Sequence, residues 1–248
     1  MLIDARNVTK AFGAFKAVDD ASVSVEAGDI LGLIGPNGAG KSTFFNCLTG
    51  DLPVTAGTVL FDGTDVTRRP PEARAALGLA RTFQVPLTFE SMSVLDNATI
   101  GALLRHANAR EARAKAREVL QRVGLGAVVD APARSLGTPG RKRLEIARAL
   151  ASEPKALLLD EAMAGLTPAE VHEAIELVRR IHGGGITIVI VEHIMQVIIS
   201  LAQRVVVFHQ GREISRGTPR EVTSDPKVIE AYLGRRRVRH DMGHGADP

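Results

Sequence analysis

The sequence predicts an α/β fold built around a parallel sheet, and three features carry this prediction. Residues 156–159 and 186–191 are apolar runs, typical of strands buried on both faces. A helix pattern lies between them, as the connection of two parallel strands requires. A glycine-rich turn at residues 35–40 joins a further apolar strand to a helix. The chain has 248 residues, 45% apolar and 24% charged, so it can bury a sizeable core as one large domain or two small ones.

The first third of the chain has the pattern of strands. Residues 2–34 contain short alternating segments, such as 22–25 and 30–34, broken by glycines. The segment 43–48 contains no helix breaker and ends at Gly50, so we expect a helix there. Residues 57–66 have a hairpin pattern in which Asp62-Gly63 supplies the turn.

The middle of the chain, from about residue 86 to 151, is expected to be a helical insertion. Five apolar side chains of residues 110–123 fall on one helical stripe, closed by Gly124: Ala112, Ala116, Val119, Leu120 and Val123. Strand patterns return at 155–160, 186–191 and 204–208. The helix between the first two begins with Thr167 as N-cap, Pro168 in the first turn and Glu170 three residues after the cap.

Composition excludes several classes of protein. The single cysteine, Cys47, excludes an internal disulfide and a metal site with several cysteines. A net charge of only +3 and 4% aromatic residues argue against a nucleic-acid partner. No apolar run reaches the roughly 18 residues of a membrane span, and the N-terminus lacks a secretory pattern. We therefore expect a protein of the reducing cytosol.

Residues 35–42 match the phosphate-binding loop G-x-x-x-x-G-K-[ST] between a predicted strand and a predicted helix. Glycines let backbone N–H groups approach phosphate oxygens, and the helix directs its positive dipole end at them. Lys41 is expected to reach the β and γ phosphates, and Ser42 to place its hydroxyl on Mg²⁺.

Two further elements follow at predicted strand ends. The run Leu157-Leu158-Leu159 delivers Asp160 and Glu161 to the carboxyl edge of the sheet, where open α/β sheets bind ligands. Asp160 is expected to bind the metal or its water, and Glu161 to polarise the attacking water. His193 follows the next strand and can contact the γ phosphate or hold that water.

In this order and spacing the motifs resemble those of the ATP-binding-cassette (ABC) ATPases over residues 3–234, most closely the ATPase subunit of bacterial branched-chain amino-acid importers. Gly35–Ser42 is similar to Walker A, Arg81-Thr-Phe-Gln84 to the Q-loop, Asp160-Glu161 to the Walker B end and Val191-Glu-His193 to the switch histidine. The ending at residues 228–234 is also similar to that subgroup.

The resemblance implies a P-loop NTPase (RecA-like) core with an N-terminal antiparallel β subdomain and an inserted helical subdomain. It implies one ABC ATPase domain over 1–234, with the core at 1–85 and 152–234, the insertion at about 86–151 and a flexible basic tail at 235–248. It also implies that Phe12 stacks on adenine and that Gln84 contributes to both catalysis and metal binding. The implied catalytic residues are Glu161, His193 and Gln84, and the implied metal-binding residues are Ser42, Gln84 and Asp160. The implied nucleotide-binding residues are Phe12, Gly35, Pro36, Asn37, Gly38, Ala39, Gly40, Lys41, Ser42 and Thr43.

The sequence departs from the family at the signature loop, which closes over ATP on the opposite subunit. Where Leu-Ser-x-Gly-Gln is expected, the chain has Leu136, Gly137, Thr138, Pro139 and Gly140. Gly137 lacks the serine hydroxyl, and Pro139 lacks the N–H of the second glycine. A shifted loop that still works is the alternative, in which Gly140 offers a substitute N–H. Thr167 likewise stands where the family has the D-loop Asp or Asn.

The resemblance implies hydrolysis of ATP with Mg²⁺ to drive a separate membrane permease, with a second ABC ATPase completing a hetero- or homodimer. Residues around Gln84 and the helical insertion are expected to face the permease, so the chain would be peripheral on the cytoplasmic face of the membrane. Three alternatives remain: a soluble ABC-type ATPase without a permease, a P-loop small-molecule kinase, and a nucleotide-binding module that does not hydrolyse. The insertion is short for a DNA-repair relative, and Asp160, Glu161 and His193 favour water as the acceptor.

Overall fold

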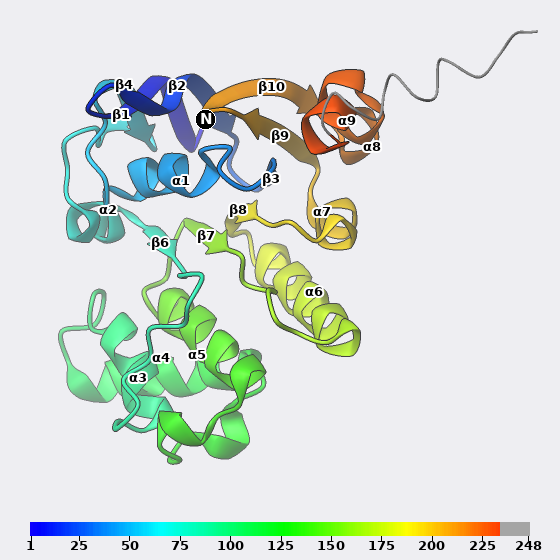
Figure 1. Cartoon of the computed structure of the whole chain (residues 1–248). Helices are drawn as coiled ribbons and strands as arrows, with labels where there is room; N and C mark the ends of the chain where they lie inside the picture. The colour runs from blue at the N-terminus through cyan, green and yellow to red at the C-terminus, as the bar shows by residue number, and fades with distance from the viewer. Residues whose placement is uncertain (234–248) are drawn as a thin grey trace, which may run out of the picture.

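The computed structural model describes residues 1–233, shown in Figure 1, and the basic tail expected at 235–248 lies outside them. Its centre is a six-stranded sheet with the order β10-β9-β3-β8-β7-β6. All neighbours in this sheet are parallel except β9 and β10, which are antiparallel. The strands are β3 (Ile30–Ile34), β6 (Leu79–Arg81), β7 (Ala156–Asp160), β8 (Thr187–Val191), β9 (Arg204–His209) and β10 (Arg212–Gly217).

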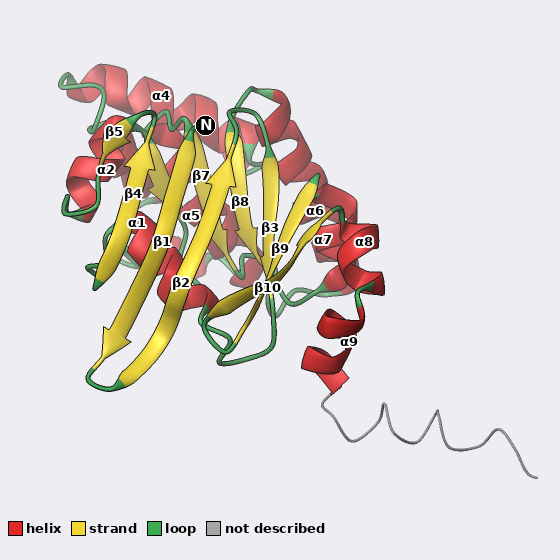
Figure 2. Cartoon of the chain, turned by 90° about the horizontal axis from the view of Figure 1, so that it is seen from above, coloured by secondary structure: helices red, strands yellow, loops and turns green. Residues whose placement is uncertain are grey.

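A second sheet is antiparallel, with the order β2-β1-β4-β5, and Figure 2 shows its three long strands side by side. It consists of β1 (Ile3–Phe12), β2 (Phe15–Val25), β4 (Ala56–Phe61) and β5 (Thr64–Asp65). The expected hairpin turn is present, with Asp62 and Gly63 at φ +49° and +74°. β1 and β2 are longer than the short segments expected. The sequence pattern underestimates them because register shifts near Val8 and Lys10 interrupt the alternation of buried and exposed side chains.

Every residue of β3, β7 and β8 is buried, because helices or the second sheet cover both faces. Leu157 and Leu159 belong to a core shared with helices of the insertion and with α6 and α7. Leu158, between them, belongs to the other core, together with α1 (Lys41–Thr49) and the antiparallel sheet. This alternation explains why the strands read as continuous apolar runs.

Helices of the insertion form a group below the sheet in Figure 1. They are α3 (Val94–Ala102), α4 (Ala109–Arg122) and α5 (Thr138–Ala151), with short 3₁₀ turns at Gly126–Val128 and Ala133–Ser135. The predicted stripe on α4 is buried, and Gly124 follows at φ +81°. The remaining helices are α2 (Pro71–Leu77), α6 (Pro168–Gly183), α7 (Met195–Leu201), α8 (Pro219–Ser224) and α9 (Pro226–Leu233).

Candidate functional site

The predicted phosphate loop forms one wall of a cavity of about 680 Å³ at the carboxyl edge of the parallel sheet. Its loop side comprises Asn37, Gly38, Ala39, Gly40, Lys41, Ser42 and Thr43. Gln84, Glu161 and His193 line the same cavity from the ends of β6, β7 and β8. The fold therefore brings residues that are far apart in the sequence, such as Asn37 and His193, to one place, which is the sheet edge predicted for ligand binding.

Two glycines allow the loop to pass close to the neighbouring backbone. A Cβ atom on Gly35 would lie 2.2 Å from the Phe208 carbonyl oxygen, and one on Gly40 would lie 2.3 Å from that of Ala17. Gly40 also has φ +98°, in the left-handed region, directly before α1 begins. The backbone N–H groups at this helix start can consequently face the cavity without obstruction, as a phosphate site requires.

The Lys41 ammonium lies within the loop, donating hydrogen bonds to the carbonyl oxygens of Gly35 at 2.7 Å and Pro36 at 3.0 Å. Burial lowers the pKa of Lys41, and the nearby carboxylates of Glu161 and Asp160 partly oppose this shift. A partly desolvated cation at this position is suited to binding phosphate, since the attraction is stronger where water is excluded.

The three predicted catalytic side chains meet in the cavity. Gln84 Nε2 donates a 2.7 Å hydrogen bond to Glu161 Oε2, and His193 Nδ1 lies 4.0 Å from the same oxygen. Glu161 has φ +45°, and its N–H donates to the Val191 carbonyl oxygen of β8 at 2.9 Å. This bond and the left-handed conformation turn the chain at the end of β7, so that the Glu161 side chain enters the cavity.

Asp160 lies beside the cavity rather than in its lining, and it is 5% exposed. Its Oδ2 accepts a hydrogen bond from Arg81 Nη2 at 3.2 Å. Burial raises the pKa of Asp160, whereas the Arg81 guanidinium opposes this shift. The oxygens of Ser42, Asp160 and Gln84 are of the type that Mg²⁺ takes, so these residues fit the predicted metal. Residues 1–233 contain no group of three or more His, Cys, Asp or Glu arranged for a metal.

Two buried charged residues that sequence reasoning missed support the loop after β7. Lys142 of α5 donates to the Glu161 carbonyl oxygen at 3.1 Å. Glu192 Oε1 accepts from the Met163 N–H at 2.9 Å, while its buried Oε2 has no hydrogen-bond partner. Burial raises the pKa of Glu192. The sequence signal for Glu192 was its place beside His193 at the end of an apolar strand, whereas Lys142 gave none.

The aromatic residue nearest the cavity is not the expected one. Phe12 lies at the tip of the β1–β2 hairpin, where it is 50% exposed, has Lys10 Nζ 5.0 Å from its ring centre, and does not line the cavity. Phe15 and Ala17 of β2 line it instead. The stacking role of Phe12 stays a prediction, and Phe15 is a second ring available to an adenine.

The expected signature loop, Leu136–Gly140, forms the start of α5 and does not line the cavity. Gly137 is the N-cap of α5 and, lacking a side chain, caps no N–H group, while Pro139 lies in the first turn. Thr167 caps α6 as expected: its N–H donates to Glu170 Oε2 at 2.7 Å, and its hydroxyl accepts from the Glu170 N–H at 3.4 Å.

Comparison with known families gives two matches. The family described as ABC transporter matches residues 18–164. A second, described as branched-chain amino acid ATP-binding cassette transporter, matches residues 212–238.

Similar curated proteins cover 94% of the chain. One is the probable branched-chain amino acid transport ATP-binding protein LivG of Methanocaldococcus jannaschii, 35% identical, with 94% of this chain and 97% of the relative covered. Another is the high-affinity branched-chain amino acid transport ATP-binding protein BraF of Pseudomonas aeruginosa, at 34%, with 94% and 98% covered. The lipopolysaccharide export system ATP-binding protein LptB of Escherichia coli is 35% identical, with 94% and 97% covered.

Solved structures agree with these matches. A nucleotide-free ATP-binding cassette from an ABC transporter superposes with a TM-score of 0.86 at 34% identity, covering 94% of this chain and 99% of that one. The ADP conformation of an ATP-binding cassette gives a TM-score of 0.85 at 34% identity, with 94% and 98% covered.

Proposed function

The chain belongs to the ABC transporter ATPases, and from this premise we propose that it is the ATP-hydrolysing subunit of an importer for branched-chain or related amino acids. One observation carries the hydrolytic part of this proposal. Glu161, Gln84 and His193 converge in the cavity formed by the phosphate loop, where Glu161 Oε2 lies 2.7 Å from Gln84 Nε2 and 4.0 Å from His193 Nδ1.

In the proposed mechanism the loop N–H groups and Lys41 bind the phosphates and stabilise the negative charge on the γ phosphate during hydrolysis. Glu161, held near Gln84 and His193, orients a water in line with that phosphate and accepts a proton from the water. The water oxygen bonds to the γ phosphorus while the bond from that phosphorus to the bridging oxygen breaks, so that ADP and inorganic phosphate leave. Mg²⁺, when bound with the nucleotide, would neutralise charge on the β and γ oxygens. Ser42, Gln84 and Asp160 are the residues that would hold it.

The cargo assignment rests on the C-terminal part of the chain. Identity over the whole chain does not choose a cargo, because a lipopolysaccharide export relative and a branched-chain amino acid relative are both 35% identical. The separate match of residues 212–238 to the branched-chain amino acid cassette family supports the importer.

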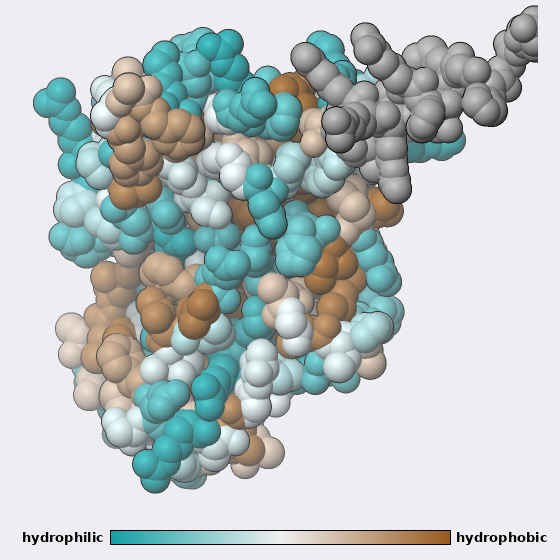
Figure 3. Space-filling view, viewed as in Figure 1, coloured by the Kyte–Doolittle hydropathy of each residue, from teal (hydrophilic) through white to brown (hydrophobic). Residues whose placement is uncertain are grey.

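We place the permease contact on the face where the core meets the insertion. A groove of about 310 Å³ opens there between α1, α2 and β6 on one side and α3 on the other. The exposed apolar residues Ile100 and Leu104 line it, and Figure 3 shows apolar side chains gathered over the adjoining part of the insertion. Further exposed apolar residues lie at the end of α3 or in the segment before it: Val85, Leu87, Phe89 and Leu103. No helix among residues 1–233 is long and apolar enough to cross a membrane.

Assembly is tested by a gentle detergent pull-down of the tagged chain from its native membranes. We expect two multi-span proteins and a second cassette ATPase, and the chain at the cytoplasmic face. Recovery of the chain alone, from the soluble fraction, would contradict the transporter assignment and favour the soluble ATPase.

Hydrolysis is tested with the Glu161→Gln variant, which keeps the size of the side chain and the hydrogen bond to Gln84. Phosphate release is expected to fall by about 100-fold or more, because the proton acceptor is lost. Binding of a non-hydrolysable ATP analogue should stay within about threefold of wild type. Glu118→Gln, on the exposed face of α4, is the control and should hydrolyse like wild type. Transfer of the γ phosphate to an organic acceptor instead of water would identify a kinase.

A further inference from the structure

Arg81, the last residue of β6, is held by side chains from three parts of the core. Its Nη1 donates to Asn46 Oδ1 at 2.7 Å, to Thr49 Oγ1 at 3.2 Å and to Asp51 Oδ2 at 2.7 Å. Its Nη2 donates to Asp160 Oδ2 at 3.2 Å, and its Nε to the Thr82 carbonyl oxygen at 3.2 Å.

Two aromatic rings fix the plane of the guanidinium. The central carbon of Arg81 lies 4.4 Å from the ring centre of Phe83 and 5.3 Å from that of Phe45. The Arg81 side chain is 12% exposed, so water competes little for its donors. Because Nη1 and Nη2 belong to one rigid plane, the guanidinium cannot turn toward one partner without moving the donor that faces the other.

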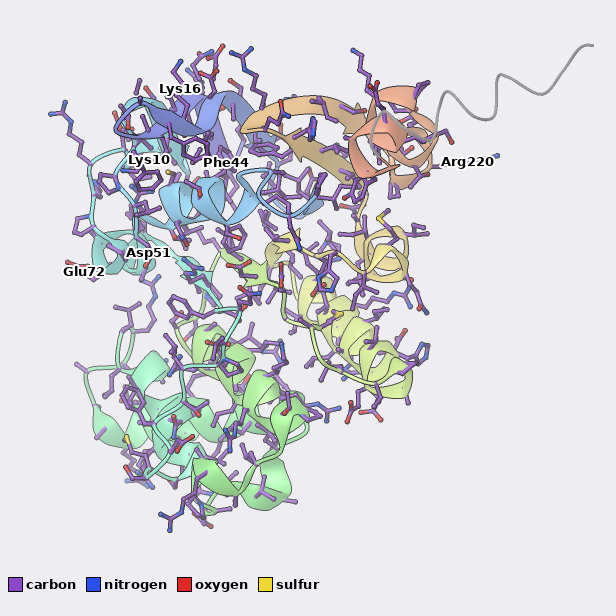
Figure 4. The ribbon with its side chains drawn as sticks, viewed as in Figure 1. Lys10, Lys16, Phe44, Asp51, Glu72 and Arg220 are labelled. Atoms are coloured by element: carbon purple, nitrogen blue, oxygen red, sulfur yellow. The ribbon has the colours of Figure 1, made fainter. Side chains whose placement is uncertain are left out.

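The two carboxylates bound by Arg81 face different parts of the molecule. The Asp160 side chain is 8% exposed and lies beside the nucleotide cavity. The Asp51 side chain is 32% exposed and lines the groove between the core and the insertion, together with Arg81 and Thr49. Figure 4 shows Asp51 beside α2, on the side of the core that faces the insertion. Asp51 does not line the nucleotide cavity.

We propose that Arg81 is a positioning residue that fixes the Asp160 carboxylate to the wall of this groove through Asp51, so that an occupant of the groove alters the predicted metal-binding residue. The first half of this proposal concerns only the chain itself. The second half rests on the proposed function, which places the permease in the groove. A positively charged group of the permease that reached Asp51 would compete with Arg81 for this carboxylate. The guanidinium would then move, and its hydrogen bond to Asp160 Oδ2 would change.

The proposal is tested on the full-length chain with Arg81→Met, Asp51→Asn and the double variant. The dissociation constant of a non-hydrolysable ATP analogue is measured with EDTA and again with Mg²⁺, and the value with EDTA divided by the value with Mg²⁺ reports how much the metal strengthens binding. A loss of general structure weakens binding in both media and leaves the ratio unchanged. The ratio requires neither hydrolysis nor a permease, so its outcome is independent of whether the proposed function holds.

We expect Arg81→Met to reduce the ratio by about 10-fold, the lower end of the effect of residues that support a metal ligand. Asp51→Asn should reduce it by about threefold to 10-fold, although Asp51 does not line the nucleotide cavity. The double variant should equal Arg81→Met, because Asp51 acts only through the guanidinium. The matched control is Asp62→Asn, which removes an exposed carboxylate paired with Lys155, and it should leave the ratio unchanged.

An unchanged ratio in Asp51→Asn, or additive effects in the double variant, would overturn the proposal. If Arg81→Met does not fold, Arg81→Lys takes its place. A lysine ammonium keeps the charge but cannot hold both carboxylates in one plane, so the ratio should still fall. A wild-type ratio in folded Arg81→Lys would show that charge alone suffices and would equally overturn the positioning role.

Discussion

The burial of Cys47 determines the reactivity of its thiol. It lies on the buried face of α1, and burial raises the pKa of its thiol to about 11. The thiolate is the reactive form, so we expect no reaction with a thiol reagent at pH 8 in the native protein and complete reaction in denaturant. A time course with an aromatic disulfide reagent measures this. Rapid labelling of native protein would show that α1 opens readily.

The same pKa predicts a pH dependence of stability. Between pH 9 and 11 the unfolded chain loses the Cys47 proton while the folded chain keeps it, so the free energy of unfolding falls as the pH rises through this window. Below pH 9 both states hold the proton, so the free energy of unfolding keeps its full value there and does not change with pH through Cys47. Denaturant titrations of wild type and Cys47→Ala at pH 8 and 10.5 measure the effect, and the variant should show the smaller decrease. Equal decreases would contradict it.

The positions of the candidate site residues divide according to whether they depend on local sequence, while their roles stay predictions. Lys41 and Ser42 could be predicted because the loop, strand and helix that position them are contiguous. Glu161 and His193 could be placed at one edge because parallel strands end there. Arg81 and Phe15 could not, since their contacts depend on how β6 meets α1 and how β2 lies against the phosphate loop.

At the scale of an element, α1 depends on a buried arginine at its end. Arg74 is 1% exposed and donates to the carbonyl oxygens of Cys47 at 2.8 Å and Leu48 at 2.6 Å, the unpaired acceptors of the last turn. It also donates to the Arg69 and Thr67 carbonyls. Burial lowers the pKa of Arg74, and these acceptors compensate part of the cost of desolvating its charge.

We therefore expect Arg74→Met to lower the free energy of unfolding by about 2–4 kcal/mol, because several buried acceptors lose a charged donor. Chemical denaturation measures this. Arg68→Met, which changes an exposed arginine nearby, is the control and should be neutral within about 0.5 kcal/mol. A neutral Arg74 variant would mean that water replaces the guanidinium at these carbonyls.

Elements were predictable where a signal is local and strong. The α6 start shows this, since Thr167, Pro168 and Glu170 form the predicted capping box in the structure. The boundaries of α3 were not predicted, although Ser93 and Asp96 form a local helix-start pattern and the buried Val94, Ala98 and Ala102 recur at helical spacing. The pattern is short and follows a loop without strand or helix signals, so it indicates only that the stretch belongs to the insertion. β1 and β2 were underestimated for a related reason: residues such as Asn7 and Asp20, at φ +50° and +60°, break the alternation without ending the strand.

At the scale of the whole molecule, the start of α5 lies outside the cavity of its own chain. Under the proposed function we therefore expect it to act on hydrolysis only across the interface with a second cassette. We expect the double variant Gly137→Ser, Pro139→Gly to raise hydrolysis in the assembled complex by about 10-fold or more, since it restores two donors at about 1.5–3 kcal/mol each. The structure accepts the serine: Gly137 has φ −66°, and a Cβ there meets only Pro139 Cδ, at 3.8 Å.

The matched control is Gly137→Ala with Pro139→Gly, which adds the Cβ and removes the proline but supplies no hydroxyl. Phosphate release per complex, measured for both variants and wild type, separates the hydroxyl from the change in backbone. The isolated chain should respond to neither, because its own cavity contains none of these residues. Equal hydrolysis in all three complexes would show that Leu136–Gly140 already works as it stands. A response confined to the complex would indicate that Leu136–Gly140 acts on the nucleotide bound to the partner's phosphate loop. The site that contains Lys41 would then not depend on this chain's own Leu136–Gly140.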